Sequence, residues 1–555
     1  MQNGTAIDAR LVPMRLIPAP YWALIALSSF FQLIIFPVAG PLPVWRAGFC
    51  WFALSPLLLA LMQTRISKPL TIAGAALLAY LCGVLWYMGD CSWIYQTMYL
   101  YGGLPKPIAA GILCLFSLYL GLYHALFGVL FSLARRAGWG NAGALLACPF
   151  LWVAVELLRA RLTGFPWDLL GYAQIDNLLV TRLAPMAGVM ALSFLIMSLN
   201  AAFAGIFLFR ARKRPLVFAT VVASAAMLQV CGRFFRSPTN PASTQLAVML
   251  QENLAVGAAN REVRPMTESD ELDQFSKLSL NPERFSGQPL NGAAGSTEGR
   301  QPTVLIWPEA PSHLQSNDPR VLTELASLAR RSHAPVIAGG LGVERDSDSS
   351  RGYLLFDSAM LLDQQGQYSG RYDKIHLVPW GEFIPFKEFF SFAHKLTEGA
   401  GDMDRGHERG AFHAAGHSYG IFICYESIFG NEVREFVRNG AQVLVNISDD
   451  GWYGDTGAPW QHLNMARMRA IENSRWVLRS TNTGITTAID PYGRTIYQAP
   501  RHVRGAFVFP FEFRENQTFY TRHGDWFAYC CVAVTVMVIG LGLRQWVALD
   551  WKHAE

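Results

Sequence analysis

A series of long apolar stretches constrains this chain of 555 residues more than any other feature. A helix crosses a bilayer with about 20 consecutive apolar residues, because only a helix or a closed barrel satisfies its own backbone hydrogen bonds in lipid. The pattern predicts an α-helical membrane bundle of about eight spans, about seven in the N-terminal half and one near the C-terminus. The stretches lie at residues 18–37, 45–62, 70–90, 107–133, 142–159, 184–209, 215–233 and 525–543. Only 16% of the residues are charged, against about 25% in soluble domains.

Basic residues follow alternate spans and indicate the orientation of the bundle. The turns carry Arg65 with Lys68, then Arg135 with Arg136, and then the cluster at 210–214. Because cytoplasmic turns are rich in lysine and arginine, we expect these turns inside the cell and the large region after residue 233 outside the cytoplasmic membrane. The net charge is only +5. No basic block is dense enough to indicate binding to nucleic acid.

The region from 244 to 515 has a different character. Short β-rich runs such as "TQLAVMLQEN", "PTVLIWPE", "YGIFICYE" and "AQVLVNISDD" alternate with helical patterns at 319–331 and 461–475. Strands that alternate with helices are typical of an α/β domain. We therefore predict a bundle over residues 1–233 and an extracytoplasmic α/β domain over 234–520. A C-terminal transmembrane helix with a short cytoplasmic tail would occupy 521–555.

Three reactive side chains stand near the ends of predicted strands. Glu309 ends "VLIWPE", Lys374 follows "RYD", and Cys424 ends "YGIFIC". A carboxylate can act as general base, a thiol as nucleophile, and an ammonium can stabilise a developing oxyanion. Each residue alone also has an ordinary structural role, as a helix cap, a surface charge or a buried core thiol. However, Cys424 is the one cysteine between 244 and 524, and an idle thiol is a liability outside the cytoplasm.

The order Glu309, Lys374, Cys424 resembles the nitrilase superfamily, and several longer motifs narrow this resemblance. In combination with the predicted spans they are similar to the apolipoprotein N-acyltransferase family of bacterial inner membranes. The motifs are "YLYGGLP" (99–105), "LTGFPWDLLGYAQID" (162–176), "WPE" (307–309), "DKIHLVPWGEFIPF" (373–386), "CYESIFG" (424–430), "NISDDGWYG" (446–454), "QHLNMARMRAIENSRWVLRSTNTG" (461–484) and "TRHGDW" (521–526). In this family "SDDGW" is more usually Ser-Asn-Asp-Ala-Trp.

The resemblance implies a nitrilase-like α-β-β-α sandwich and a two-step acyl transfer without a metal or cofactor. Cys424 would take an acyl chain from a phospholipid, with phosphatidylethanolamine the expected donor. The thioester would then pass that chain to the N-terminal amine of a diacylglyceryl-modified lipoprotein. Glu309 would be the general base and Lys374 the oxyanion donor. Glu382, Tyr425 and Glu426 would line or support the site.

Two other functions use the same features differently. A membrane-anchored nitrilase-like amidase would hydrolyse a small amide with the same three residues and water as the acceptor. A hydrolase of soluble amides, however, needs one anchor and not a whole bundle. A non-catalytic lipid-binding scaffold would need the bundle but not the reactive set, so the intact set favours the transferase.

Two further segments invite predictions about lipid. Arg159 and Arg161 fall on the outer side of the predicted bundle, against the charge rule, so we expect them to contact a lipid phosphate. Residues 383–395 contain Phe383, Phe386, Phe389, Phe390 and Phe392. This segment is predicted to be a lid that dips into the outer leaflet.

Overall fold

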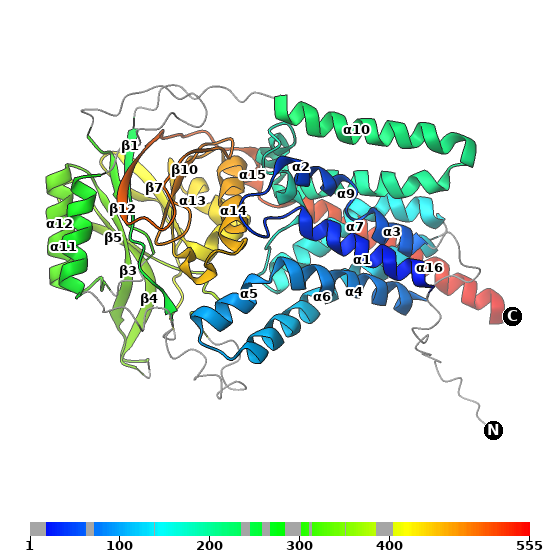
Figure 1. Ribbon diagram of the computed structural model, residues 1–555, viewed down its shortest axis with the longest axis horizontal. Coiled ribbons are helices and arrows are strands. Elements are labelled where there is room, and N and C mark those ends of the chain that lie inside the picture. Colours follow the sequence, from blue (N-terminus) through cyan, green and yellow to red (C-terminus); the bar gives the residue numbers. More distant parts are fainter. Residues whose placement is uncertain are drawn as a thin grey trace.

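The computed structural model describes residues 18–62, 71–137, 139–234, 245–257, 267–282, 301–309, 314–349, 351–383 and 403–554. These residues form a helical bundle with a two-sheet α/β domain at one end of it (Figure 1). The bundle contains the apolar stretches of the sequence, and the α/β domain contains the β-rich region that begins near residue 244.

The bundle confirms the predicted number of spans. In the described ranges, seven helices are long and apolar enough to cross a membrane, and α1 is a shorter apolar helix. The second predicted span is broken between Trp51 and Ser55, and the last helix continues beyond the predicted span. The helices are α1 (Ala19–Ile34), α2 (Val44–Ala47), α3 (Ser55–Met62), α4 (Ile72–Asp90), α5 (Trp93–Gln96), α6 (Lys106–Arg136), α7 (Gly140–Leu162), α8 (Ala184–Ala187), α9 (Val189–Gly205), α10 (Arg214–Phe234) and α16 (Trp526–Ala554).

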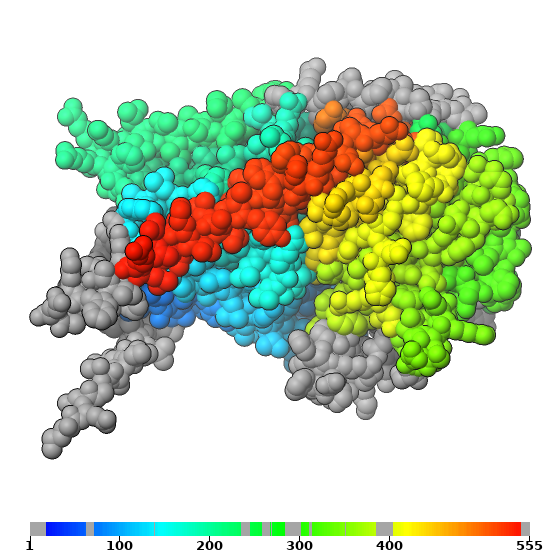
Figure 2. Space-filling model, turned by 180° about the vertical axis from the view of Figure 1, so that it is seen from behind, coloured from blue at the N-terminus to red at the C-terminus, as the bar shows by residue number. Residues whose placement is uncertain are grey.

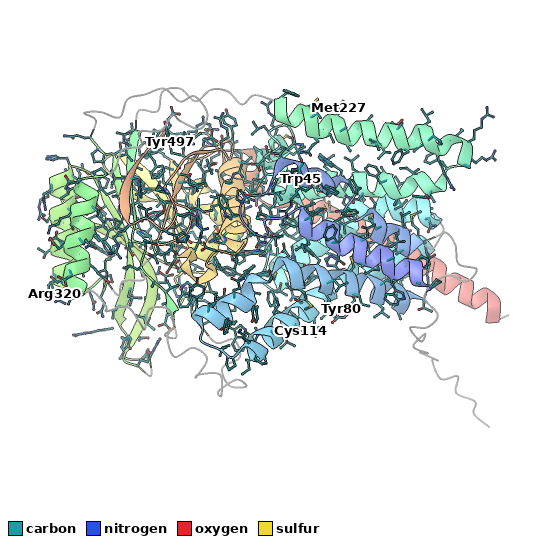
Figure 3. All side chains as sticks on the ribbon, in the orientation of Figure 1. Trp45, Tyr80, Cys114, Met227, Arg320 and Tyr497 are labelled. Carbon is teal, nitrogen blue, oxygen red and sulfur yellow. The ribbon has the colours of Figure 1, made fainter. Side chains whose placement is uncertain are left out.

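The outer surface of the bundle is apolar. Leu115 on α6 is 69% exposed and Leu146 on α7 is 78% exposed. Cys114 and Met227 are also exposed, and Figure 3 labels them on α6 and α10. Because exposure of so much apolar surface to water is unfavourable, these side chains are suited to contact with lipid. Helix α10 runs along the outside of the other helices (Figure 1), with only 11% of its most apolar window buried.

The α/β domain contains two six-stranded sheets. The first has the order β12-β1-β2-β3-β4-β5 and the second β11-β10-β9-β8-β7-β6. Pairs β1–β2, β2–β3, β7–β8 and β8–β9 are parallel. The strands are β1 (Gln245–Gln251), β2 (Val304–Ile306), β3 (Val336–Arg345), β4 (Tyr353–Leu362), β5 (Tyr368–Asp373), β6 (Phe412–Ala414), β7 (His417–Ile423), β8 (Val443–Ser448), β9 (Val477–Thr481), β10 (Thr487–Ile489), β11 (Thr495–Gln498) and β12 (Gly505–Phe511).

Helices cover both outer faces of the paired sheets. Helices α11 (Glu268–Leu280) and α12 (Pro319–Ser332) pack on the first sheet, whereas α13 (Gly430–Arg438) and α14 (Ala458–Asn473) pack on the second. Arg320, labelled in Figure 3, belongs to the outermost layer. A core of aliphatic and aromatic side chains fills the space between the sheets. This arrangement confirms the predicted α-β-β-α sandwich.

Local sequence explains why the predicted elements form where they do. All residues of β2 and β8 are buried, which is typical of central strands in parallel sheets. Helix α12 begins where the Asp318 side chain accepts the Arg320 N–H, and it ends at His333 in the left-handed conformation. An acceptor at the N-cap and a left-handed residue after the last turn are ordinary helix boundaries.

The α/β domain and the bundle share one apolar core. Tyr425, Ile428 and Phe429 of the α/β domain belong to the same buried cluster as the bundle side chains. Met465 and Met468 of α14 join it as well. Figure 2 shows α16 crossing the surface of the bundle from the α/β domain to the far end. The second sheet therefore rests on the bundle through α14 and the segment after β7.

Candidate active site

The structure brings the three predicted reactive residues together at the ends of strands. Glu309 lies just after β2, Lys374 directly follows β5, and Cys424 begins η10 (Cys424–Ile428) after β7. Lys374 Nζ donates a hydrogen bond to Glu309 Oε1 over 2.8 Å. Both of these side chains act electrostatically on the Cys424 thiol. Two packed sheets thus place residues more than a hundred positions apart in one buried site.

Lys374 is held by three carboxyl groups. Besides Glu309, its Nζ donates to Glu382 Oε1 over 2.6 Å and to Asp357 Oδ2 over 2.9 Å. The Lys374 side chain is 0% exposed. Burial alone would lower the pKa of the ammonium, but the three carboxyl groups reverse this effect and hold the pKa well above its usual value. Lys374 is therefore a permanent cation.

Backbone N–H groups fix two of the three carboxylates. Asp449 N–H donates to Glu309 Oε2 over 2.6 Å, and Val378 N–H donates to Glu382 Oε2 over 3.0 Å. Hydrogen bonds from N–H groups favour the ionised form of a carboxyl group. Glu309 is thereby held with one oxygen on the Lys374 ammonium and the other on the Asp449 N–H. The Glu309, Asp357 and Glu382 oxygens are close enough to hold a cation, and the Lys374 ammonium is that cation.

Cys424 has a left-handed backbone conformation, with φ at +46°. A non-glycine residue in this region is strained, and such strain gathers at functional sites. The sharp change of direction between β7 and η10 presents the thiol at the edge of the sheet. Burial and the Glu309 carboxylate raise the pKa of this thiol, whereas Lys374 lowers it. In the resting state the thiol therefore keeps its proton and needs a base to ionise.

A buried polar cluster behind Cys424 was not predicted from the sequence. His462 Nε2 lies 3.0 Å from the Cys424 carbonyl oxygen, and His462 Nδ1 lies 2.8 Å from Asp450 Oδ1. Arg479 donates to Asp450 Oδ2 over 2.7 Å. Burial and Arg479 lower the pKa of His462, so its ring is a neutral donor to the carbonyl. In the sequence, the one local sign of this polar cluster is His462, a histidine next to apolar positions on a predicted helix.

The residue before His462 connects this cluster to the bundle. Gln461 Nε2 donates to the Pro37 carbonyl oxygen over 2.8 Å, and Gln461 Oε1 accepts the Trp167 indole N–H over 2.8 Å. The Trp167 ring also stacks on the His462 ring. The first turns of α14 thus contact the bundle on one side and the backbone of Cys424 on the other.

Tyr425 and Glu426 support the site from the other side. The Tyr425 hydroxyl donates to the Gly164 carbonyl oxygen of the bundle over 2.8 Å. Glu426 is 3% exposed and accepts the N–H groups of Ile375 and Ile423. It thereby ties the segment after β5 to the end of β7. Glu426 therefore fixes the position of Lys374 relative to Cys424, and Tyr425 joins the segment after β7 to the bundle.

The structure also bears on the residues that were predicted to bind lipid. Arg159 is 3% exposed and donates to the Tyr87 hydroxyl inside the bundle, so the prediction that it meets a lipid phosphate is wrong. A buried arginine in a membrane span satisfies its donors within the protein, because the hydrocarbon of the bilayer offers it no partner. Arg161 forms an ion pair with Asp525. Of the predicted phenylalanine lid, residues 384–395 lie outside the described residues.

Comparison with known proteins shows which family the chain belongs to. Residues 35–202 match the family described as apolipoprotein N-acyltransferase N-terminal domain, and residues 302–508 match the carbon-nitrogen hydrolase family. The apolipoprotein N-acyltransferase of Geobacter metallireducens is 33% identical over 95% of this chain and 96% of its own length. The enzyme of the same name from Methylococcus capsulatus is 32% identical over 87% and 91% of the two chains. That of Photobacterium profundum is 28% identical over 95% and 99%. The protein is therefore a member of the apolipoprotein N-acyltransferase family.

Proposed function

We propose that this protein transfers an acyl chain from a membrane phospholipid to the N-terminal amine of diacylglyceryl-cysteine lipoproteins, through a thioester on Cys424. The observation that carries this proposal is the buried contact of Glu309 and Lys374 beside Cys424, on a domain that shares its core with a membrane bundle. A site built in this way has the nucleophile on a domain that is packed against a membrane bundle. Membership of the family agrees with it.

In the first half-reaction Glu309 takes the proton from the Cys424 thiol. The thiolate attacks the ester carbonyl of the phospholipid, with phosphatidylethanolamine the proposed donor. Lys374 stabilises the oxyanion of the tetrahedral intermediate through the positive charge of its ammonium, which the three carboxyl groups already hold in place. The acyl–oxygen bond then breaks, and Glu309 gives its proton to the glycerol oxygen of the departing lysophospholipid.

In the second half-reaction the lipoprotein amine attacks the thioester. Glu309 accepts a proton from the attacking nitrogen, the carbon–sulfur bond breaks, and the thiol is regenerated with an amide as product. Cys424 is 7% exposed, and this burial limits attack by water. The amidase alternative uses the same residues with water as acceptor. It does not account for a bundle whose Gly164 and Trp167 contact Tyr425 and Gln461, the residues next to Cys424 and His462.

We also propose that the α/β domain lies on the periplasmic side of a bacterial inner membrane. The division would be a bundle at 1–233, the catalytic domain at 234–520 and the last helix with its tail at 521–555. Support comes from Arg135 and Arg136 at the end of α6 and from the basic cluster that precedes α10. Basic residues of this kind mark cytoplasmic turns.

Reporter fusions test this orientation. Alkaline phosphatase fused after Arg136 or Arg214 is expected to be inactive, and after Asp176 or Pro500 to be active, because that enzyme matures only outside the cytoplasm. Fluorescent-protein fusions at the same positions serve as the reciprocal control. A fluorescent, phosphatase-negative fusion at Pro500 would contradict the periplasmic location and the lipoprotein acceptor together.

Mass spectrometry of a lipoprotein tests the activity itself. In cells depleted of this protein, a purified lipoprotein is expected to carry two acyl chains, and re-expression should restore a third chain on the N-terminal amine. A mature lipoprotein with three chains in the depleted cells would contradict the proposed function. Re-expression of the Cys424→Ser variant provides the matched control.

A further inference from the structure

The carboxyl groups around Lys374 do not balance its charge. Asp357, Glu309 and Glu382 each contact the one ammonium within 2.9 Å. If all three were ionised, the buried site would hold two uncompensated negative charges. Carboxylates that share one site cannot all ionise at ordinary pH, so one of them retains a proton. The question is which carboxyl group holds it.

The hydrogen bonds distinguish the three groups. Glu309 and Glu382 each accept a backbone N–H with the oxygen that does not face Lys374. Such a bond stabilises the negative charge of a carboxylate, although burial still raises the pKa of Glu382. Among the described residues, Lys374 is the one donor to the Asp357 carboxyl group. The ligand oxygens of Asp357 and Glu309 lie within 4.8 Å of each other. Two carboxyl groups so close together beside one cation are more stable when one of them carries a proton.

We propose that Asp357 is a positioning residue that holds this proton and donates it in a hydrogen bond to Glu309, which keeps Glu309 the ionised base beside Lys374. The proposal rests on the role of Glu309 given above. Burial and the neighbouring Glu309 raise the pKa of Asp357 to about 8, although Lys374 lowers it. A neutral Asp357 at pH 7 is the result. Sequence patterns gave no role to this residue, which is a polar interruption in the apolar run of β4.

The proposal has a consequence for the pH dependence of acylation. The charged and titratable groups facing Asp357 are Lys374, Glu309 and Glu382, with the Cys424 thiol beyond Lys374. Above a pH of about 8 Asp357 loses its proton, and the added negative charge opposes formation of the Cys424 thiolate. Titration of the thiol itself acts in the opposite direction, because a higher pH increases the thiolate fraction. Titration of Asp357 therefore predicts a fall in rate at alkaline pH, where titration of the thiol alone predicts a rise.

The experiment compares the full-length protein with Asp357→Asn. Thioester formation on Cys424 is measured in a single turnover with a water-soluble short-chain p-nitrophenyl ester, from about pH 6 to about pH 10. In the parent protein the rate is expected to fall above a pH of about 8. In Asp357→Asn the alkaline fall should be absent, because the amide donates a hydrogen bond as the neutral carboxyl group does but has no proton to lose in this pH range.

Asp373→Asn is the matched control. Asp373 precedes Lys374, points to the opposite side of the strand and pairs with Arg371, so the same change of charge there should leave the alkaline fall in place. An unchanged alkaline fall in Asp357→Asn would overturn the proposal. Loss of acylation at every pH in a folded Asp357→Asn protein would also overturn the proposal, because Asp357 would then be needed in its ionised form. A parent protein that forms no thioester on Cys424 would instead overturn the proposed function.

Discussion

Replacing Cys424 with serine is expected to abolish acyl transfer. A serine hydroxyl has a far higher pKa than a thiol, so Glu309 cannot ionise it, and an oxygen ester would be a poorer acyl donor to the amine than a thioester. Burial of the site makes ionisation of a serine hydroxyl still less favourable, since burial already raises the pKa of the thiol. We expect no hydroxylamine-sensitive acyl group on the variant and no third acyl chain on the lipoprotein.

Cys114→Ser is the matched control for this variant. Cys114 is an exposed thiol of α6 on the bundle surface, far along the chain from the reactive set, so its loss should leave both half-reactions intact. The acylated peptide is identified after digestion by mass spectrometry, which separates Cys424 from the bundle cysteines. Normal turnover by Cys424→Ser, or acylation of another cysteine at the same rate, would disprove the assignment of the nucleophile.

Replacing Lys374 with alanine is expected to slow both half-reactions by roughly 10²–10³-fold, because each passes through an oxyanion that the ammonium stabilises. The change also leaves Asp357, Glu309 and Glu382 without their cation. Removal of one partner from a buried ion pair costs about 3–5 kcal/mol of folding free energy. The protein lowers this cost by taking up protons on the carboxyl groups, and a protonated Glu309 no longer acts as a base.

Single-turnover acylation and the release of acyl chain to a lipidated peptide measure the two half-reactions of Lys374→Ala separately. Lys277→Ala serves as the control, because Lys277 is an exposed lysine paired with Asp273 on α11. The thermal midpoint in detergent separates loss of fold from loss of chemistry. A folded Lys374→Ala protein that keeps the parent rate in either half-reaction would contradict its role as oxyanion donor in both.

Much of the candidate site could be predicted from the sequence. Glu309 and Cys424 each stand where an apolar run ends, whereas Lys374 follows the polar strand β5. The packed sheets bring these strand ends together. The signal for Asp357 was weaker. It interrupts the apolar run "YLLFDSAMLL" of a strand whose second half is buried, and a buried charge in such a place needs a partner. The sequence does not say which partner, since Lys374 reaches Asp357 only through the pairing of β4 with β5.

Some elements carried too little local signal to be predicted. Strand β9 contains Arg479 and β5 reads "YSGRYD", so neither has an apolar run or a regular alternation. These strands exist because neighbours already in the sheet offer them hydrogen-bond partners. β-propensity depends on such neighbours more than on the segment itself.

The sequence by itself determined the spans, the apolar strands of both sheets and the one cysteine between residues 244 and 524. Spans and strands could be predicted because apolar run length and periodicity act over short distances along the chain. The tertiary structure alone decided which polar groups meet. His462 reaches the Cys424 carbonyl and Gln461 reaches Trp167 only once α14 lies between the second sheet and the bundle. Arg159 turned inward to Tyr87 for the same reason. Buried polar side chains must find partners, and those partners are chosen by packing between distant segments.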